Sequence, residues 1–308
     1  MVIDVIIPTY KPDNGLFKLI DKLKSQTKQP SRIVLMNTEQ KYIENLMRGR
    51  KSIKGVEIYN ISAWEFDHGN TRNAGANGSV ADILIYMTQD AIPEGDDMIE
   101  ELIRPLMEGK AEVSYARQVP RDDASLAERF SREFNYPGTS CVKSAADIER
   151  LGIKAFFCSN VCAAYRRDVF DMLGRFPANM IFNEDMVFAH KVLMNGYRIA
   201  YSANARVVHS HNYSNMQQFH RNYDIAVSQK MHPEVFEGIS SESEGKSYAK
   251  AAYSYFREHG RPQAFVPFAI TCAYRLLGFK LGKKYDRMPR KMVLSCTMSP
   301  RYFKRMWS

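Results

Sequence analysis

The sequence contains no uninterrupted run of eighteen apolar residues, and it starts with a β-prone run instead of a charged and then apolar leader. Membrane-crossing helices and signal sequences both need such runs, so the sequence predicts a cytoplasmic protein. Cysteine is scarce as well, with five residues, an odd number, in a chain of 308. A chain of this length can bury a sizeable core without disulfides, and five thiols suggest no disulfide framework, which fits a reducing compartment.

Acidic residues are outnumbered, with 34 Asp and Glu against 43 Lys and Arg and a net charge of +9. This excess favours an anionic partner, whether a nucleotide, a lipid head group or a nucleic acid. After Tyr274 the chain carries ten basic residues and one acid, Asp286, interleaved with aromatic residues such as Tyr302 and Trp307. Such a mixture favours an interfacial surface near anionic lipid, with nucleic acid or an ordinary solvated helical face as alternatives.

Short β-prone runs alternate with helical patterns over the first half of the chain. Strands are expected at 2–7, 32–36 and 56–61, and helices at 16–23 and 40–48. This alternation predicts an α/β fold with a Rossmann-like, mostly parallel sheet flanked by helices, whose ligands bind at the carboxyl ends of the strands. From Ser214 onward the pattern is helical. We therefore expect a catalytic domain over 1–215 and a helical, basic C-terminal region over 216–308.

The apolar run at residues 84–87 is followed by Thr88-Gln89-Asp90 and is typical of a buried parallel strand. An acid at the carboxyl end of such a strand is well placed to hold a metal ion that neutralises a diphosphate. The alternative is that Asp90 only caps the helix that follows.

Arg72 lies in the early turns of a small-residue helix that opens after the polar turn at Asp67. A guanidinium there can bind a phosphate bidentately, near the positive end of the helix. The alternative is a surface ion pair between Arg72 and Asp67 or Asp82.

Two further segments carry polar groups at positions suited to a ligand. An apolar strand expected over 154–165 is interrupted by Ser159 and Asn160, which could bond a hydroxylated ligand. Glu184 and Asp185 begin a helix, where acids commonly complement the helix dipole. Because adjacent acids point in different directions, one can cap the helix while the other faces the cleft.

His209 and His211 follow the last expected strand. Residues two apart on an extended segment point to opposite faces, so at most one of these imidazoles is expected to meet a metal held by Asp90. The preceding strand favours His209, and a purely structural histidine is the alternative.

Six short motifs together resemble one enzyme family. They are Ile7-Pro8-Thr9-Tyr10, Asp67-His68-Gly69 with Thr71-Arg72-Asn73, Thr88-Gln89-Asp90-Ala91, Phe157 with Ser159-Asn160, Asn183-Glu184-Asp185, and His209-Ser210-His211-Asn212-Tyr213-Ser214. In this order, between about residue 3 and residue 215, they resemble the family-2 glycosyltransferases of GT-A fold. Among these, the likeness is to the bacterial rhamnosyltransferases that build O-antigen, capsule and wall polysaccharides.

The resemblance implies an inverting transfer of a sugar, L-rhamnose from dTDP-L-rhamnose, to an acceptor hydroxyl. The basic and aromatic residues after Tyr274 add the expectation of a lipid-linked saccharide acceptor and of peripheral contact with the inner face of the cell membrane, and no nucleic acid is expected as a partner. By analogy Asp185 is the catalytic base. Asp90 and His209, with His211 as a further candidate, hold Mg²⁺ or Mn²⁺. The residues expected at the nucleotide or diphosphate are Pro8, Thr9, Tyr10, Asn37, Asp67, Arg72 and Gln89. Asn160 and Glu184 are expected at the acceptor or the sugar.

Two departures from the family pattern and three alternative functions accompany this interpretation. Gln89 leaves a single carboxylate where many relatives have two, and Asn37 stands where many have an acid for the base and ribose. A UDP-hexose or galactofuranose donor would keep the fold and chemistry. A nucleotidyltransferase would share the α/β nucleotide site and the metal, and a non-catalytic sugar-nucleotide-binding protein would bind without turnover.

Overall fold

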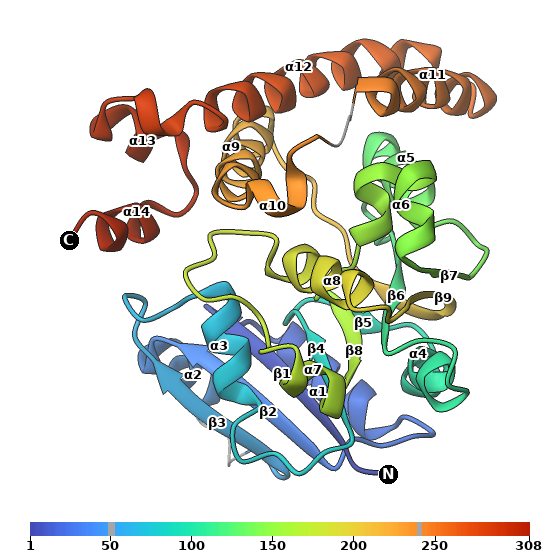
Figure 1. Cartoon of the computed structure of the whole chain (residues 1–308), viewed down its shortest axis with the longest axis vertical. Coiled ribbons are helices and arrows are strands. Elements are labelled where there is room, and N and C mark those ends of the chain that lie inside the picture. The colour runs from blue at the N-terminus through green and yellow to red at the C-terminus, as the bar shows by residue number, and fades with distance from the viewer. Residues whose placement is uncertain (49–52, 239–241) are drawn as a thin grey trace. The chain divides into compact units, whose positions relative to one another are not determined.

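The computed structural model describes residues 1–48, 53–238 and 242–308, which form two compact units (Figure 1). Unit 1 comprises residues 1–119, 136–179 and 184–209, and unit 2 comprises 120–135, 180–183 and 210–308. Unit 2 therefore includes two segments that come before the boundary expected at 215/216. The division into a catalytic domain and a C-terminal region stays a prediction.

Unit 1 is built on a sheet that has nine strands within the described residues. The strand order is β3-β2-β1-β4-β8-β6-β9-β5, and β7 pairs with β9. The strands are β1 (Ile3–Tyr10), β2 (Arg32–Thr38), β3 (Val56–Ile61), β4 (Ile83–Met87), β5 (Ile92–Pro93), β6 (Val113–Val119), β7 (Cys141–Lys143), β8 (Cys162–Arg166) and β9 (Ile199–Val208). The helices of this unit are α1 (Gly15–Lys24), α2 (Gln40–Met47), α3 (His68–Gly75), α4 (Met98–Met107), α6 (Ile148–Leu151), α7 (Arg167–Met172) and α8 (Glu184–Met194).

The half of the sheet formed by β3, β2, β1 and β4 is parallel throughout. Every residue of β4 is buried, as expected for a parallel strand with both faces covered. The predicted α/β fold with helices around a central sheet is confirmed in this unit. The register pairs Thr9 of β1 with Asn37 of β2, so the polar residues at both carboxyl ends lie side by side.

The other half of the sheet is mixed. β8 is antiparallel to β4 and β6, whereas β6 is parallel to β9. The β6–β9 register shifts between Ala116 and Arg117, and such a bulge re-aims the residues that follow it, here Gln118. The strand expected over 154–165 is shorter than predicted, because a 3-10 turn (Gly152–Phe156) replaces its first part and β8 starts only after the polar pair Ser159-Asn160.

Unit 2 is helical. It comprises α5 (Leu126–Asn135), α9 (Asn215–Met231), α10 (Pro233–Phe236), α11 (Glu242–Glu258), α12 (Phe265–Gly282), α13 (Arg290–Cys296) and α14 (Pro300–Met306). Phe130 of α5 packs against Phe256 of α11 and Phe268 of α12. Tyr223 of α9 anchors a second cluster with Val293 and Phe303. The helical C-terminal extension expected from the sequence is therefore present.

Residues Pro262–Gly282 form the one segment, within the described residues, that is long and apolar enough to cross a membrane by length and composition. The segment still contains no uninterrupted run of eighteen apolar residues, because Thr271, Tyr274 and Arg275 interrupt it. All five cysteines lie within the described residues, and none forms a disulfide.

The buried side chain of Asp224 in α9 forms hydrogen bonds with the segment that precedes α14. It accepts hydrogen bonds from Thr297 Oγ1 at 2.6 Å and from Met298 N at 3.0 Å. Burial raises the pKa of Asp224 to about 7, so between about pH 4 and 7 the folded carboxyl keeps a proton that the unfolded one has lost. We therefore expect raising the pH from 5 to 8 to destabilise unit 2 through this group by about 2 kcal/mol.

The measurement is urea unfolding of the full chain at pH 5 and pH 8, followed at Trp307 in a Trp64→Phe background. Asp224→Asn removes the titrating group, so its free energy of unfolding should change less between the two pH values than that of the parent. An equal pH dependence in both proteins would contradict the assignment.

Candidate functional site

The loop after β4 is hydrogen-bonded to the last residue of β1. The Gln89 side chain accepts a hydrogen bond from Tyr10 N at 2.9 Å and donates one to Tyr10 O at 3.0 Å. Tyr10 is 42% exposed, its ring meets Tyr42 edge to face, and Lys11 Nζ lies 5.3 Å from the Tyr10 ring centroid. Gln89 therefore organises this edge of the sheet, and Tyr10 offers an aromatic surface there on which a nucleotide base can stack.

Thr9 and Asn37 form a buried polar pair at the adjoining strand ends. Thr9 Oγ1 donates to Asn37 Oδ1 at 3.2 Å, and Asn37 Nδ2 donates to Asn60 Oδ1 at 2.7 Å. Asn60 is the last residue but one of β3 and was not singled out in the sequence. Pro8 precedes Thr9 in β1, where it lies opposite Met36. The nucleotide contacts predicted for Pro8, Thr9 and Asn37 stay predictions.

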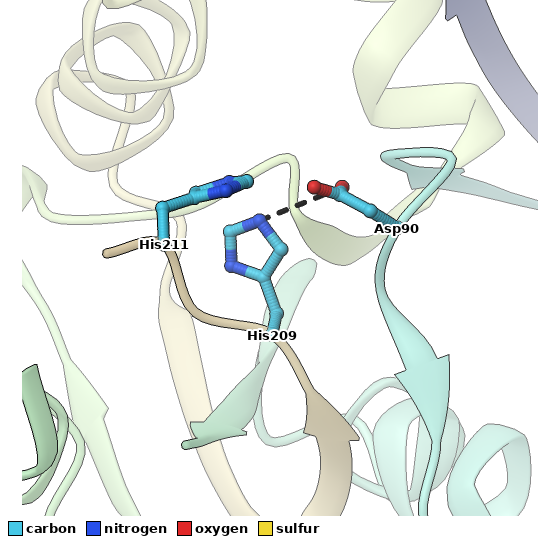
Figure 2. Close-up of side chains that lie close together, drawn as sticks. All are labelled: Asp90, His209 and His211. Atoms are coloured by element: carbon cyan, nitrogen blue, oxygen red, sulfur yellow. Dashed lines mark ion pairs between the residues drawn. The ribbon is translucent and has the colours of Figure 1, made fainter. Parts of the chain in front are cut away.

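Asp90 and His209 meet at the carboxyl end of β4, as Figure 2 shows. His209 Nε2 lies 3.5 Å from Asp90 Oδ1, and the His209 side chain is 8% exposed whereas that of Asp90 is 41% exposed. His209 Nδ1 is 2.9 Å from Gln118 Oε1. Since a carbonyl oxygen only accepts, Nδ1 carries the proton in this contact, and Nε2 can present a lone pair beside the carboxylate.

This donor set suits a divalent cation. A carboxylate oxygen and an imidazole nitrogen 3.5 Å apart can share one ion, and this pair of ligand types suits Mn²⁺ as well as harder cations. His211, also labelled in Figure 2, follows two residues later in the chain and belongs to unit 2. Its role as a further ligand stays a prediction.

Arg72 lies in a buried ion pair that the sequence analysis did not foresee. Its Nη1 is 3.2 Å from Glu184 Oε1 and donates to His68 O at 2.8 Å. The partner is thus neither of the surface acids considered from the sequence. Asp67 is the N-cap of α3, where its Oδ1 accepts hydrogen bonds from Gly69 N and Asn70 N. The diphosphate contacts expected of Asp67 and Arg72 stay predictions.

Asn160 connects the two adjacent acids at the start of α8. Its backbone N–H donates to Asp185 Oδ2 at 3.0 Å, and its Nδ2 donates to Glu184 Oε1 at 3.1 Å. Tyr165 OH in turn donates to Asn160 Oδ1 at 2.8 Å. Three side chains expected at the acceptor side, Asn160, Glu184 and Asp185, are therefore brought together by direct contacts.

The two acids have opposite electrostatic environments. Burial and the neighbouring charge of Glu184 raise the pKa of Asp185 to about 7. Burial acts on Glu184 too, but the charges of Arg72 and His68 outweigh it and hold the pKa of Glu184 below its usual value. Asp185 is only half-buried and keeps contact with solvent. The pair therefore combines an acid whose charged form is stabilised, Glu184, with one whose pKa is raised toward neutral pH, Asp185.

Sequence reasoning missed the residues that support these groups. Gln118, which orients His209, belongs to a strand whose register depends on the bulge after Ala116. Tyr165, which orients Asn160, follows two alanines in an apolar strand and looks like a core residue. No local motif distinguishes either side chain, because its function comes from partners far away in the sequence.

Comparisons with known proteins agree with the motif pattern. The family profile described as Glycosyl transferase family 2 matches residues 4–174. The O-antigen chain rhamnosyltransferase RfbN of Salmonella typhimurium (strain LT2) is 36% identical over 94% of this chain and 92% of its own. The O-antigen chain rhamnosyltransferase WbaN of Salmonella anatum is 35% identical over 92% of this chain and 90% of its own.

Solved structures show the same fold at low sequence identity. The mannosyltransferase PcManGT of Pyrobaculum calidifontis, determined with GDP-Man and Mn²⁺, matches with a TM-score of 0.55 and 14% identity over 99% of this chain and 87% of that one. Residues 1–349 of S. aureus TarS match with a TM-score of 0.51 and 13% identity over 93% and 91% of the two chains. These neighbours confirm the predicted GT-A fold.

Proposed function

The chain belongs to glycosyltransferase family 2, and from this premise we propose that it transfers L-rhamnose from dTDP-L-rhamnose, with inversion, to a hydroxyl of a lipid-linked saccharide. The names of its two relatives, both O-antigen chain rhamnosyltransferases, support this donor and acceptor class. The observation that carries the catalytic part is the geometry at the start of α8, where Asp185 accepts hydrogen bonds on both oxygens from the backbone N–H groups of Asn160 and Met186 and lies next to Glu184.

Asp185 is proposed as the general base. An inverting displacement needs a group on the acceptor side that takes the hydroxyl proton while the new bond to the sugar forms. A carboxylate with a pKa of about 7 accepts this proton more readily than an ordinary carboxylate and is still substantially ionised at neutral pH. The backbone N–H groups of Asn160 and Met186 fix the orientation of both its oxygens.

Asp90 and His209 are proposed to hold the divalent cation, Mg²⁺ or Mn²⁺. When bound, this ion would neutralise the negative charge that develops on the departing diphosphate. Gln118 keeps His209 in the tautomer that a ligand requires, and Gln89 fixes the loop that carries Asp90. The Mn²⁺ in the mannosyltransferase structure belongs to that protein, and it supports the same class of ion here.

Donor and acceptor are proposed to bind on opposite sides of the reacting carbon. Tyr10, Thr9 and Asn37 provide an aromatic ring and polar groups at the nucleotide side of the sheet edge. Glu184 and Asn160, which are hydrogen-bonded to each other, provide polar atoms at the acceptor or sugar side. The acceptor's lipid anchor would bring the enzyme to the inner face of the cell membrane, with peripheral contact.

Calorimetric titration of the full chain tests this proposal. We expect dTDP-L-rhamnose to bind more tightly than UDP-glucose or UDP-galactose, and Mn²⁺ to strengthen its binding at least tenfold, because the ion neutralises the diphosphate beside Asp90. Tighter binding of a UDP sugar would overturn the donor assignment and keep the fold and chemistry. Absence of binding by all three would overturn the proposed reaction.

A further inference from the structure

The α12 helix of unit 2 exposes an apolar face. Its outward residues recur every three or four positions, which places them on one side of a helix. They are Val266, Ala269, Ile270, Ala273, Leu276 and Leu277. The four larger side chains are between 48% and 64% exposed. An exposed row of this length is unusual for a helix in contact only with water.

The opposite face of α12 is fixed against α9. A Cβ atom on Gly278 would lie 2.2 Å from Phe219 O, and one on Gly282 would lie 2.3 Å from Tyr223 O, so only glycine allows this close approach. Thr271 Oγ1 also donates to Asn215 Oδ1 at 2.7 Å. The side of α12 that contacts α9 thus carries two glycines and Thr271, and Phe268 packs into the cluster with α5 and α11. The exposed row of apolar residues lies on the other side of the helix and has no part in these contacts.

Positive charge is concentrated in the same region. Residues 262–308 contain ten of the 43 basic residues and one of the 34 acidic residues, Asp286, so the rest of the chain is neutral and this segment carries the whole net charge of +9. Asp286 is itself paired with Lys230 at 2.5 Å. Lys280 continues the exposed face of α12, and Lys284 is exposed just beyond the helix.

We propose that the exposed face of α12 docks on an anionic phospholipid bilayer, with the helix lying in the plane of the head groups. This inference rests on the membrane contact in the proposed function and assigns it to a defined surface. The apolar side chains of α12 enter the boundary between head groups and acyl chains, while lysines such as Lys280 bind lipid phosphates. Tyr253, 48% exposed and packed on Phe265, adds an amphipathic ring suited to that depth.

Two features favour this occupant over the other possibilities. A second copy of the chain would bring an identical basic segment against this one across a twofold interface, and like charges oppose such a contact. A membrane-crossing α12 would have to leave α9, because the glycine contacts at Phe219 and Tyr223 hold it along that helix. A bilayer with anionic lipid would bury the apolar face of α12 and would also attract the basic residues of this segment.

Vesicle flotation of the full chain tests the docking surface. We expect binding to vesicles of phosphatidylglycerol and phosphatidylcholine, and much weaker binding to phosphatidylcholine alone. The double variant Ile270→Glu/Leu277→Glu should bind roughly 100-fold more weakly, because two side chains that would enter the bilayer become charged. The matched control Val80→Glu/Met172→Glu alters two apolar residues of unit 1 that are even more exposed, and it should bind like the parent.

Equal binding by the Ile270→Glu/Leu277→Glu variant and its control would overturn the proposal. The depth of α12 is checked with Leu276→Trp and brominated lipids: quenching by bromines near the head groups supports an in-plane helix, and stronger quenching at the bilayer centre overturns it. A dimer in gel filtration that dissociates in the Ile270→Glu/Leu277→Glu variant would assign the face to a second copy and overturn the lipid assignment.

The vesicle assay contains no sugar, so it is independent of the proposed reaction. A parallel assay with a water-soluble saccharide acceptor separates the two hypotheses. We expect the Ile270→Glu/Leu277→Glu variant to transfer sugar to this acceptor at the parent rate. If neither protein transfers sugar although the parent binds vesicles, the reaction is wrong and the docking surface stands.

Discussion

Asp185→Asn is expected to lower kcat roughly 10³-fold, because a positioned general base contributes about 10²–10⁴ to a proton transfer and an amide cannot take the proton. Donor affinity should change little, since Asp185 acts on the acceptor hydroxyl. The measurement is steady-state transfer together with calorimetric titration of the donor. Because Asn can replace only one of the two acceptor oxygens at residue 185, thermal unfolding of the variant checks that the start of α8 stays folded.

The pH dependence distinguishes a base from a residue that only holds structure. With a pKa of about 7 at Asp185, kcat/KM of the parent should rise with pH up to about 7 and then level off, since only the ionised carboxylate accepts a proton. Glu184→Gln removes the adjacent negative charge that raises this pKa, so its profile should shift to lower pH. A profile of Glu184→Gln that coincides with the parent, or substantial turnover by Asp185→Asn, would contradict the base assignment.

The sequence predicts groups whose chemistry is visible locally. Asp90 follows an apolar run that is typical of a buried strand, and the acids at 184 and 185 begin a helix, so both positions were expected from the local sequence. The side chains that these groups contact cannot be predicted from the local sequence in the same way. Arg72 is 112 positions from Glu184, and its choice of this acid over nearer ones depends on how α3 and α8 approach each other.

The same reasoning explains the apolar face of α12. Its sequence predicts a helix in this part of the chain but does not say which side of the helix is buried. The glycines at 278 and 282 mark the side that contacts α9, because α9 approaches them too closely for any side chain to fit. The orientation of a helix is set by the shape of the neighbouring surface as well as by hydrophobicity, and only the structure contains that neighbour.

Asp90→Asn is expected to lower kcat/KM by roughly 10²–10³-fold, the effect of losing one stabilising group at a developing charge. The loop has a single carboxylate at this point because Gln89 is an amide engaged with Tyr10, so no adjacent acid can replace Asp90. Mn²⁺ should also bind more weakly, which electron paramagnetic resonance of the free ion measures without any turnover.

A matched control for Asp90→Asn is Asp96→Asn, which removes another exposed carboxylate of unit 1, one paired with Lys22, and should leave Mn²⁺ binding unchanged. Gln118→Leu provides an independent check, since loss of the acceptor for His209 Nδ1 should weaken Mn²⁺ binding about 10- to 100-fold while both proposed ligands remain. Equal Mn²⁺ affinity in Asp90→Asn and the parent would place the ion elsewhere. If Asp90→Asn weakened Mn²⁺ binding and Gln118→Leu did not, Asp90 would remain a ligand and His209 would not be one. The reason is that only His209 depends on Gln118 for its tautomer.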